Sequence, residues 1–338
     1  MFQKLQKVLN ADLALFFNAD FNIAYFAGVK PNVACLVIPA SGKPKLFVPG
    51  FEAARMAKAS TIDVVQVGRD FLKEVCRQFP AKKIGIIPNA ISHAIAQKVK
   101  VEWNAELVSI EEQCQDLRLT KSAEEISRIT KACAITDALF QEICSNMHKF
   151  KTERDVFTFL NMRISQFGFE PSFPAIVASG KNSATPHHIP TSAKLKGFTV
   201  IDFGIIYRNY CSDITRTVFV GTPSEKQRKV YERLLSVQEK CIEKMMPGVV
   251  LEDIDDFAHR EIGPSMIHCI GHSLGIEVHD VQPRPWTLQP GNVITAEPGT
   301  YADFGIRIED DVLVTEKKPV VLTHAPKNLI VCRRVVNR

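Results

Sequence analysis

The chain has 338 residues, of which 46% are hydrophobic and 23% are charged, and its formal net charge is +5. This length suits two domains, and this composition is typical of a globular protein with enough apolar side chains for sizeable cores. The net charge is small, and basic pairs such as Lys82-Lys83 and Arg333-Arg334 are scattered without interleaved aromatic residues, which argues against a nucleic-acid-binding protein.

The first third of the chain alternates between strand-like and helix-like segments. Residues 33–50 predict a β-hairpin, because two strand-like runs flank the turn sequence SGKP. The segments that follow are predicted as helices at 51–60, 70–79 and 90–100, and as strands at 62–68, 82–88 and 105–110. This alternation predicts an α/β domain over residues 1–115.

The pattern changes near residue 115, where long helices begin. The helix predicted over 122–147 opens with a capping box formed by Ser122 and Glu125, and a second helix follows from Thr152. The later elements are predicted as strands at 172–180, 197–207, 292–299 and 305–316, and as helices at 224–248 (with a capping box) and 251–263. Residues 116–338 are therefore predicted as an α+β domain with helices packed on antiparallel sheet.

Four carboxylates stand within the strand-like runs of this second domain: Asp202, Asp213, Glu297 and Glu309. Strand interiors disfavour acids, and a buried carboxylate is costly unless it is paired or bound to metal. Asp202 and Asp213 lie in VIDFGIIYRNYCSDITRTVFVG, which reads as a hairpin that brings them together. In GIRIEDD, the alternation of strand side chains places Arg307 and Glu309 on one face.

Crowded carboxylates repel each other, and two divalent cations would balance four of them. His272, in the turn GHSLG, adds an imidazole, so the donors suit manganese, cobalt, iron or zinc. Any one of these residues alone is more often structural than a ligand, but together they favour metal. Other histidines and acids lack this context and are expected at the surface: His188, His259, His324, Asp253 and Asp255.

Nine cysteines are spread singly, and none has the CxxC spacing of a zinc or redox motif. Free thiols in this number favour a reducing compartment over a disulfide framework. No apolar run approaches the length of a membrane-spanning helix. We therefore expect a cytoplasmic protein without membrane contact.

Taken in order, the motifs ATPHH, IDFGIIYRNYCSDITRT, HCIGHSLGIEVHD, TAEPGTY and GIRIEDD resemble the signatures of the pita-bread metallopeptidases. The resemblance is strongest to the proline-specific branch, Xaa-Pro dipeptidase (prolidase) and aminopeptidase P. NADFNIAYFAGV resembles the start of a creatinase-type N-terminal domain, and LRLTKSAEEISRITKACAITD resembles the helix that joins the two domains. The resemblance implies a creatinase-type α/β domain over 1–115 and a pita-bread catalytic domain over 116–338.

The resemblance also implies roles for individual residues. Asp202 would bind one metal ion, Asp213 and Glu309 would bridge both ions, and His272 and Glu297 would bind the second ion. His187 and His279 would hold substrate and stabilise the intermediate, and Glu297 would shuttle the proton. Arg307 would orient the bridging carboxylates. Arg284 would hold the substrate carboxylate, although it stands one residue away from the position that the family motif gives to this arginine. Ser273 and Asp280 depart from the family pattern, which usually has Gly and Glu there.

The expected function is hydrolysis of the Xaa-Pro bond in a small peptide by a homodimeric, two-metal Xaa-Pro dipeptidase. The first alternative is aminopeptidase P, which acts on longer Xaa-Pro peptides. Methionine aminopeptidase lacks the N-terminal domain, and creatinase and the non-catalytic relatives lack the metal ligands. All five ligands are present in this chain, so the resemblance favours an enzyme over a binding protein.

Overall fold

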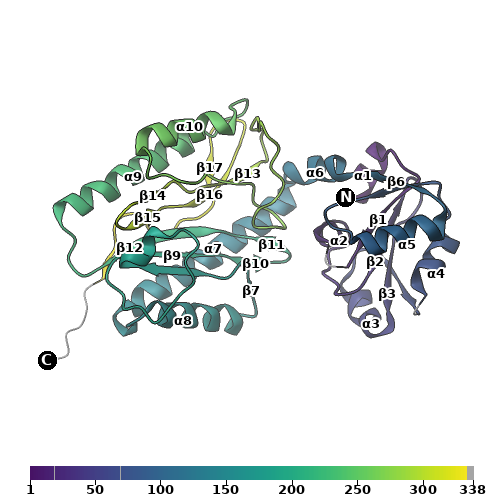
Figure 1. Cartoon of the computed structure of the whole chain (residues 1–338), viewed down its shortest axis with the longest axis horizontal. Coiled ribbons are helices and arrows are strands. Elements are labelled where there is room, and N and C mark those ends of the chain that lie inside the picture. Colours follow the sequence, from purple (N-terminus) through teal and green to yellow (C-terminus); the bar gives the residue numbers. More distant parts are fainter. Residues whose placement is uncertain (19, 69, 333–338) are drawn as a thin grey trace. The chain divides into compact units, whose positions relative to one another are not determined.

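A computed structural model of the chain describes residues 1–18, 20–68 and 70–332, and divides the chain into two units, Met1–Arg118 and Leu119–Arg338 (Figure 1). The boundary falls within helix α6 (Glu111–Leu119), close to the predicted one at 115/116. The basic pair Arg333-Arg334 lies outside the described residues. None of the helices in the described ranges has both the length and the apolar character to span a bilayer.

The first unit is built on a six-stranded mixed sheet with the order β4-β3-β2-β1-β5-β6. Its strands are β1 (Leu13–Phe17), β2 (Cys35–Pro39), β3 (Lys45–Pro49), β4 (Asp63–Val67), β5 (Lys83–Ile86) and β6 (Glu106–Ser109). Its helices before α6 are α1 (Phe2–Val8), α2 (Phe21–Ala27), α3 (Gly50–Ala59), α4 (Phe71–Gln78) and α5 (His93–Trp103). The predicted hairpin is confirmed by the antiparallel pairing of β2 with β3, and the α/β class of this unit is confirmed as well.

The core of this unit lies between the sheet and helices α4 and α5. Alternate side chains of β1, such as Leu13 and Leu15, pack with Val75 of α4 and Val99 of α5. All five residues of β1 are buried because the strand lies inside the sheet, between β2 and β5. A strand buried on both faces shows no alternation of polar residues, and the sequence analysis did not identify it. It also did not predict α1, α2 and α6.

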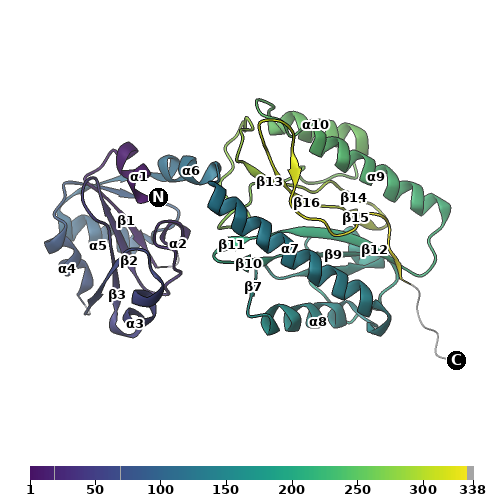
Figure 2. The same cartoon turned by 180° about the vertical axis from the view of Figure 1, so that it is seen from behind.

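The second unit combines long helices with several sheets in which almost all neighbouring strands are antiparallel (Figure 2). Its helices are α7 (Ala123–Asn146), α8 (Glu153–Gln166), α9 (Glu225–Lys244) and α10 (Leu251–Ile262), with 3-10 turns η1 (Met147–Lys149) and η2 (Gly180–Ala184). Its strands are β7 (Glu170–Pro171), β8 (Ile176–Ser179), β9 (Gly197–Phe203), β10 (Ile205–Tyr207), β11 (Tyr210–Cys211), β12 (Ile214–Val220), β13 (Val293–Ala296), β14 (Gly299–Tyr301), β15 (Gly305–Arg307), β16 (Asp310–Leu313), β17 (Val320–Val321) and β18 (Val331–Cys332). The predicted capping boxes at the starts of α7 and α9 are both present.

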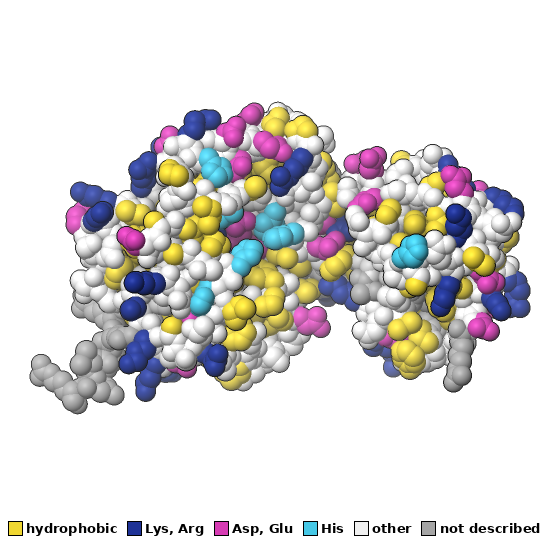
Figure 3. All heavy atoms as spheres, viewed as in Figure 1, with side chains coloured by type: hydrophobic (Ala, Val, Ile, Leu, Met, Phe, Trp, Pro, Cys, Tyr) yellow, Lys and Arg dark blue, Asp and Glu magenta, His cyan; other side chains and the backbone are white. Residues whose placement is uncertain are grey.

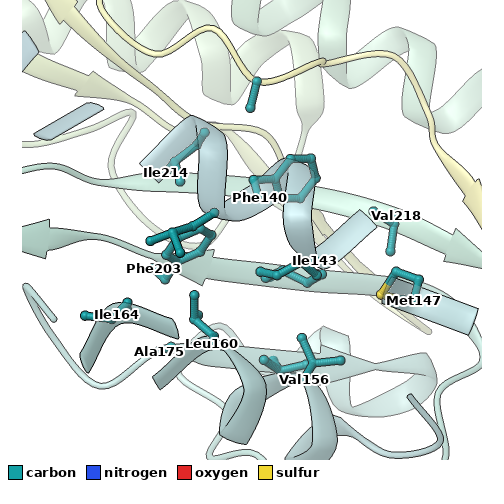
Figure 4. Packing of buried hydrophobic residues seen from close by; sticks show 14 of the residues in the cluster. Phe140, Ile143, Met147, Val156, Leu160, Ile164, Ala175, Phe203, Ile214 and Val218 are labelled. Carbon is teal, nitrogen blue, oxygen red and sulfur yellow. The ribbon is translucent and has the colours of Figure 1, made fainter. Parts of the chain in front are cut away.

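Helices α7 and α8 cover one side of the sheet with the order β18-β12-β9-β8. Figure 4 shows Phe140 and Ile143 of α7 beside Phe203 of β9, with Leu160 of α8 completing the contact. These four side chains are at most 1% exposed. This apolar layer fixes β9 and β12, the two strands next to the predicted acids.

Two strand predictions need correction. β9 and β12 do pair antiparallel, with Asp202 opposite Thr215, but the chain between them forms a second, smaller hairpin of β10 and β11. Its turn residues, Arg208 and Asn209, have φ values of 47° and 72°, as a two-residue hairpin turn requires. The segment 305–316 is two strands rather than one, because β15 pairs with β14 whereas β16 pairs with β13 and β17.

Candidate metal centre and active site

A cavity of about 650 Å³ opens on the second unit. The nine residues that the sequence analysis selected for the site all line it: His187, Asp202, Asp213, His272, His279, Arg284, Glu297, Arg307 and Glu309. Figure 3 shows histidine and acidic side chains gathered on one face of this unit. Residues separated by more than a hundred positions in the sequence therefore share one cavity.

The four acids reach the cavity from the ends of strands more often than from their interiors. Only Asp202 lies inside a strand, β9, whereas Asp213 precedes β12, Glu297 follows β13 and Glu309 separates β15 from β16. Strand ends allow the backbone to turn each carboxylate into the cavity. The Asp213 N–H, for example, donates to Asp311 Oδ2 at 3.0 Å instead of to a strand neighbour.

Three of the donors converge closely enough to hold one ion. The ligand atoms of Asp213, His272 and Glu309 all lie within 4.8 Å of one another. His272 Nε2 is 3.7 Å from Asp213 Oδ2 and 3.4 Å from Glu297 Oε1. Asp202 stands beside this group and is held by Arg307.

Two carboxylate oxygens of the cluster lack the hydrogen-bond donors that buried acids normally have. Asp202 Oδ1 and Asp213 Oδ1 are buried and have no hydrogen-bond partner among the described residues. Burial, and then the negative charge of neighbouring Glu309, raise the pKa of Asp213 well above its ordinary value. Burial likewise raises the pKa of Glu297 to about 7. These carboxyl groups have oxygens without hydrogen-bond partners, and they ionise with difficulty unless a positive charge lies beside them. Both properties fit a site for divalent cations.

His272 presents a free ring nitrogen to the acids. Its Nδ1 lies 3.2 Å from the Ser273 carbonyl oxygen, which can only accept a hydrogen bond, so Nδ1 carries the proton. Burial, and then His279, lower the pKa of His272 to about 3, so that the ring is neutral near pH 7. Its Nε2 lone pair is therefore available as a metal ligand.

Arg307 contacts a different carboxylate from the one predicted. Its guanidinium pairs with Asp202, donates to Thr215 Oγ1 at 3.0 Å, and donates to the Tyr301 hydroxyl at 2.9 Å. Thr215 in turn donates to Glu309 Oε2 at 2.7 Å, so Thr215 links Arg307 to the predicted bridging acid by hydrogen bonds. Strand alternation predicted the shared face of Arg307 and Glu309 but not the neighbour across it, and the role of Arg307 in orienting the bridging carboxylates stays a prediction.

The substrate-contacting candidates lie at the cavity with more exposure. The rings of His279 and His272 have centroids 4.1 Å apart and are tilted by 59°. Burial, and then His187, lower the pKa of His279, which keeps its ring neutral near pH 7. Arg284 is exposed at the cavity wall. The catalytic and substrate roles of His187, His279 and Arg284 stay predictions.

Sequence analysis missed two polar residues of the cavity region. His268 lines the cavity, and its Nε2 lies 2.9 Å from the hydroxyl of Tyr301, which also accepts from Arg307. Burial lowers the pKa of His268 to about 4. Both lie in motifs that also contain predicted metal ligands: His268 shares HCIGHSLG with His272, and Tyr301 shares TAEPGTY with Glu297. This proximity in the sequence was the signal that could have identified them.

Two residues expected at the surface are partly buried instead. The side chain of His188 is 15% exposed, and its Nε2 lies 2.9 Å from Glu153 Oε2. Asp255 accepts a hydrogen bond from the Ile270 N–H at 2.7 Å. Both are held by partners far away in the sequence, which no local pattern reveals. His259, His324 and Asp253 do have substantial exposure.

The two departures from the family pattern meet at one buried lysine. Lys121 Nζ lies 3.2 Å from Ser273 Oγ and 3.8 Å from Asp280 Oδ2, and the Lys121 and Asp280 side chains are 1% and 2% exposed. The Asp280 N–H donates to the Ser273 carbonyl oxygen at 2.9 Å. This hydrogen bond joins the two ends of the loop, so that His279 lies beside His272. The two changes are therefore parts of one buried cluster that closes the loop carrying both histidines.

The metal-free protein is expected to lose stability as the pH rises from about 6.5 to about 8. Burial raises the folded-state pKa of Glu297 to about 7 and that of Asp311 to about 8, so in this range the folded protein binds more protons than the unfolded chain. The free energy of unfolding then falls with increasing pH, by on the order of 2 kcal/mol. The lowered pKa values of His272 and His268 act with the opposite sign, but only below about pH 6.5, where an ordinary histidine takes up a proton.

Urea unfolding of chelator-treated protein across this range measures the slope. Added Mn²⁺ should flatten it, because bound cations replace the protons on the carboxylates. A metal-free protein whose stability is constant or increases over the same range would contradict the assignment of raised carboxyl pKa values.

A cluster of oxygen acceptors around a neutral imidazole, at the base of an open cavity, defines a metal-dependent enzyme. Residues 2–120 match the Creatinase/Prolidase N-terminal domain, and residues 127–316 match metallopeptidase family M24. The chain belongs to metallopeptidase family M24, and the predicted fold class, a creatinase-type domain followed by the pita-bread catalytic domain, is confirmed.

Relatives match the chain over almost its full length. The Xaa-Pro dipeptidase of Pyrococcus furiosus is 33% identical, over 97% of this chain and 99% of that protein. The crystal structure of the prolidase from Pyrococcus horikoshii has a TM-score of 0.89 and 30% identity, over 97% of this chain and 99% of that one. The X-Pro aminopeptidase from Thermotoga maritima has a TM-score of 0.90 and 28% identity, over the same shares of both chains.

Proposed function

We propose that this metallopeptidase is an Xaa-Pro dipeptidase that uses two divalent metal ions. The observation that carries the proposal is the group of five donors at one cavity: Asp202, Asp213, His272, Glu297 and Glu309. The names of two relatives from Pyrococcus species, both Xaa-Pro dipeptidases, support the substrate class. Manganese, cobalt, zinc and iron all accept oxygen donors together with one imidazole.

The proposed sharing of the donors is the one that the family resemblance implies, and the free oxygen of Asp202 agrees with it. Arg307 holds Asp202 Oδ2 and Thr215 holds Glu309 Oε2, while Asp202 Oδ1 has no partner among the described residues. Asp202 would therefore bind one ion through Oδ1. Asp213 and Glu309 would bridge both ions, and His272 with Glu297 would complete the second site. Four negative charges then balance two ions of charge +2.

Divalent ions bound here would supply an activated water and a polarised scissile carbonyl. His279, neutral near pH 7, carries one N–H that can donate to the developing oxyanion, and His187 lines the same cavity. Glu297 would move a proton to the leaving proline nitrogen. Because the Xaa-Pro bond has no N–H, a wall with few hydrogen-bond acceptors suits it, and Phe173 and Pro190 contribute to such a wall.

The proposal also includes a homodimer in a reducing compartment such as the cytoplasm. All nine cysteines are free of disulfides, which supports reducing surroundings. The homodimer rests on the resemblance to the family, and sedimentation of the purified protein would measure it.

Hydrolysis of Ala-Pro and of Ala-Pro-Ala, each with Mn²⁺ or Co²⁺ added, tests the proposed function. We expect Ala-Pro to be cleaved faster, and a chelator to remove the activity. Faster turnover of the tripeptide would instead favour the aminopeptidase function. Absence of metal-dependent cleavage of either peptide would reject both.

Arg284→Ala should lower kcat/KM for Ala-Pro while leaving an amidated analogue unaffected. A dipeptide ends in a carboxylate directly after proline, and Arg284 is a cation at the cavity wall. Because this side chain is exposed, we expect a loss of about 1–2 kcal/mol, below the range for fully buried charge pairs. Steady-state kinetics with Ala-Pro and Ala-Pro-amide measure it. Equal effects on both substrates, or none on either, would remove Arg284 from the site.

A further inference from the structure

Glu153, the first residue of α8, is a fully buried carboxylate outside the metal cluster. Its Oε1 accepts from Ser179 N–H at 2.8 Å and from Asn182 Nδ2 at 2.9 Å. Its Oε2 accepts from Thr191 N–H at 2.9 Å and Thr191 Oγ1 at 2.8 Å, and lies 2.9 Å from His188 Nε2. Burial acts to raise the pKa of Glu153, but these hydrogen bonds outweigh it and hold the pKa below its ordinary value.

The donors come from two segments that both border the cavity. Loop 185–193 contains no helix or strand, and five consecutive residues of it line the cavity, from Pro186 to Pro190, with His187 among them. Glu153 binds this loop through His188 and Thr191, on the C-terminal side of His187. Irregular backbone keeps one conformation only where such contacts define it.

The second segment, β8 with η2, supports the strand that carries Arg307. Ser183 Oγ in η2 accepts from the Gly305 N–H at 2.8 Å, at the start of β15. A Cβ atom at Gly305 would lie 1.8 Å from the Ser183 carbonyl oxygen, so η2 packs directly on this strand. Glu153 therefore stands between the two segments behind His187 and Arg307.

Helix stability alone does not account for these contacts. An acid in the first turn favours a helix through the helix dipole, but α8 already has a complete capping box between Thr152 and Asp155. The Glu153 carboxylate instead accepts five hydrogen bonds from residues 26 to 38 positions away in the sequence. Burying a charged group in this way is costly unless every lone pair is used. Of the donors used here, His188 lines the cavity and Thr191 belongs to the same loop.

We infer that Glu153 is a positioning residue for peptide hydrolysis: it fixes loop 185–193 so that His187 faces the substrate. The inference rests on the function proposed for the cavity. Glu153 does not touch the metal donors, so its loss should lower turnover while metal binding and the fold persist.

Glu153→Gln tests the inference at nearly constant volume. Glutamine has one NH₂ group where glutamate has a second oxygen. In either orientation of the amide, this NH₂ group faces N–H or O–H donors that bind a carboxylate oxygen in the wild-type protein, so those hydrogen bonds are lost. Hydrogen exchange of the 185–193 peptide, which contains the Thr191 amide, should become at least about tenfold faster, while peptides of β9 keep their exchange rates. We expect kcat for Ala-Pro to fall by about tenfold or more, with Mn²⁺ affinity measured by calorimetry unchanged.

Glu142→Gln is the matched control, because Glu142 pairs with Arg163 between α7 and α8 and does not contact the loop. It should leave both exchange and kcat unchanged. Thr191→Val removes one donor hydroxyl and should give a smaller change of the same kind, which keeps the test decisive if Glu153→Gln fails to fold. Unchanged kcat and unchanged loop exchange in a folded Glu153 or Thr191 variant would overturn the inference. If the wild-type protein cleaved no Xaa-Pro peptide, the proposed function would fail, while the exchange data would still decide whether Glu153 holds the loop.

Discussion

Asp213→Ala should abolish hydrolysis of Xaa-Pro peptides and remove more than one equivalent of divalent metal. Asp213 lies within 4.8 Å of His272 and Glu309 through its ligand atoms, and its Oδ1 has no partner among the described residues. A carboxylate that uses both oxygens for two ions serves both sites, so its loss weakens both. Because metal ions contribute several kcal/mol of transition-state stabilisation, kcat/KM should fall by about 10³-fold or more. Elemental analysis after gel filtration, together with kinetics, measures both effects.

Asp253→Ala is the matched control, since Asp253 is an exposed acid on α10. It should retain the wild-type metal content and turnover. Full two-metal loading of Asp213→Ala would show that Asp213 is not a bridging ligand. Loss of a single equivalent would assign it to one ion only.

The acids of this site could be selected from the sequence because each interrupts or borders an apolar run. Ile306 and Ile308 alternate with Arg307 and Glu309, and the structure buries both isoleucines in one core while Arg307 and Glu309 line the cavity. Hydrophobic alternation therefore predicted the face of each side chain. Which cation faces which acid depends on how separate strands lie beside each other, and that information is not local.

Arg307 illustrates this limit. Its partner Asp202 lies 105 positions away, on β9, and Thr215 stands opposite Asp202 in the adjacent strand β12. That register depends on the small hairpin of β10 and β11. The turn of this hairpin contains asparagine but lacks the glycine that usually identifies such a turn in a sequence. The face of Arg307 was predictable, whereas its partner was not.

Glu153 illustrates the same limit for the loop beside the cavity. In the sequence TERD it reads as an ordinary acid in the first turn of a helix, which is most often solvated. Its burial results from loop 185–193, which folds back over the start of α8 through the pairs Glu153 N–H to Ala193 carbonyl and Arg154 N–H to Thr191 carbonyl. His188 was expected at the surface for the same reason: its partner precedes it by 35 residues.

His279→Ala should keep the fold and the metals but lower kcat by about 10²-fold, the typical loss for one oxyanion-stabilising donor. His279 is not among the clustered donors Asp213, His272 and Glu309, yet its ring lies 4.1 Å from the ring of His272 at the cavity. Burial, and then His187, lower the pKa of His279, so near pH 7 the ring is neutral and carries a single N–H for the substrate. Single-turnover kinetics with Ala-Pro, on protein whose Mn²⁺ content has been measured, separate this loss from a loss of metal.

His259→Ala provides the comparison for this variant, because His259 lies on α10 with its side chain 39% exposed and only a 3.8 Å contact to Asp255. Its kcat should stay within about twofold of the wild-type value, as for a surface substitution worth less than about 0.5 kcal/mol. His188 cannot serve as the neutral control, since its removal would leave Glu153 one donor short and loosen the loop that carries His187.

If His279→Ala reduced the metal content together with kcat, the ring would be acting on the metal site through His272. If neither changed, transition-state stabilisation would have to come from another histidine at the cavity outside the donor cluster, which leaves His187, His188 and His268.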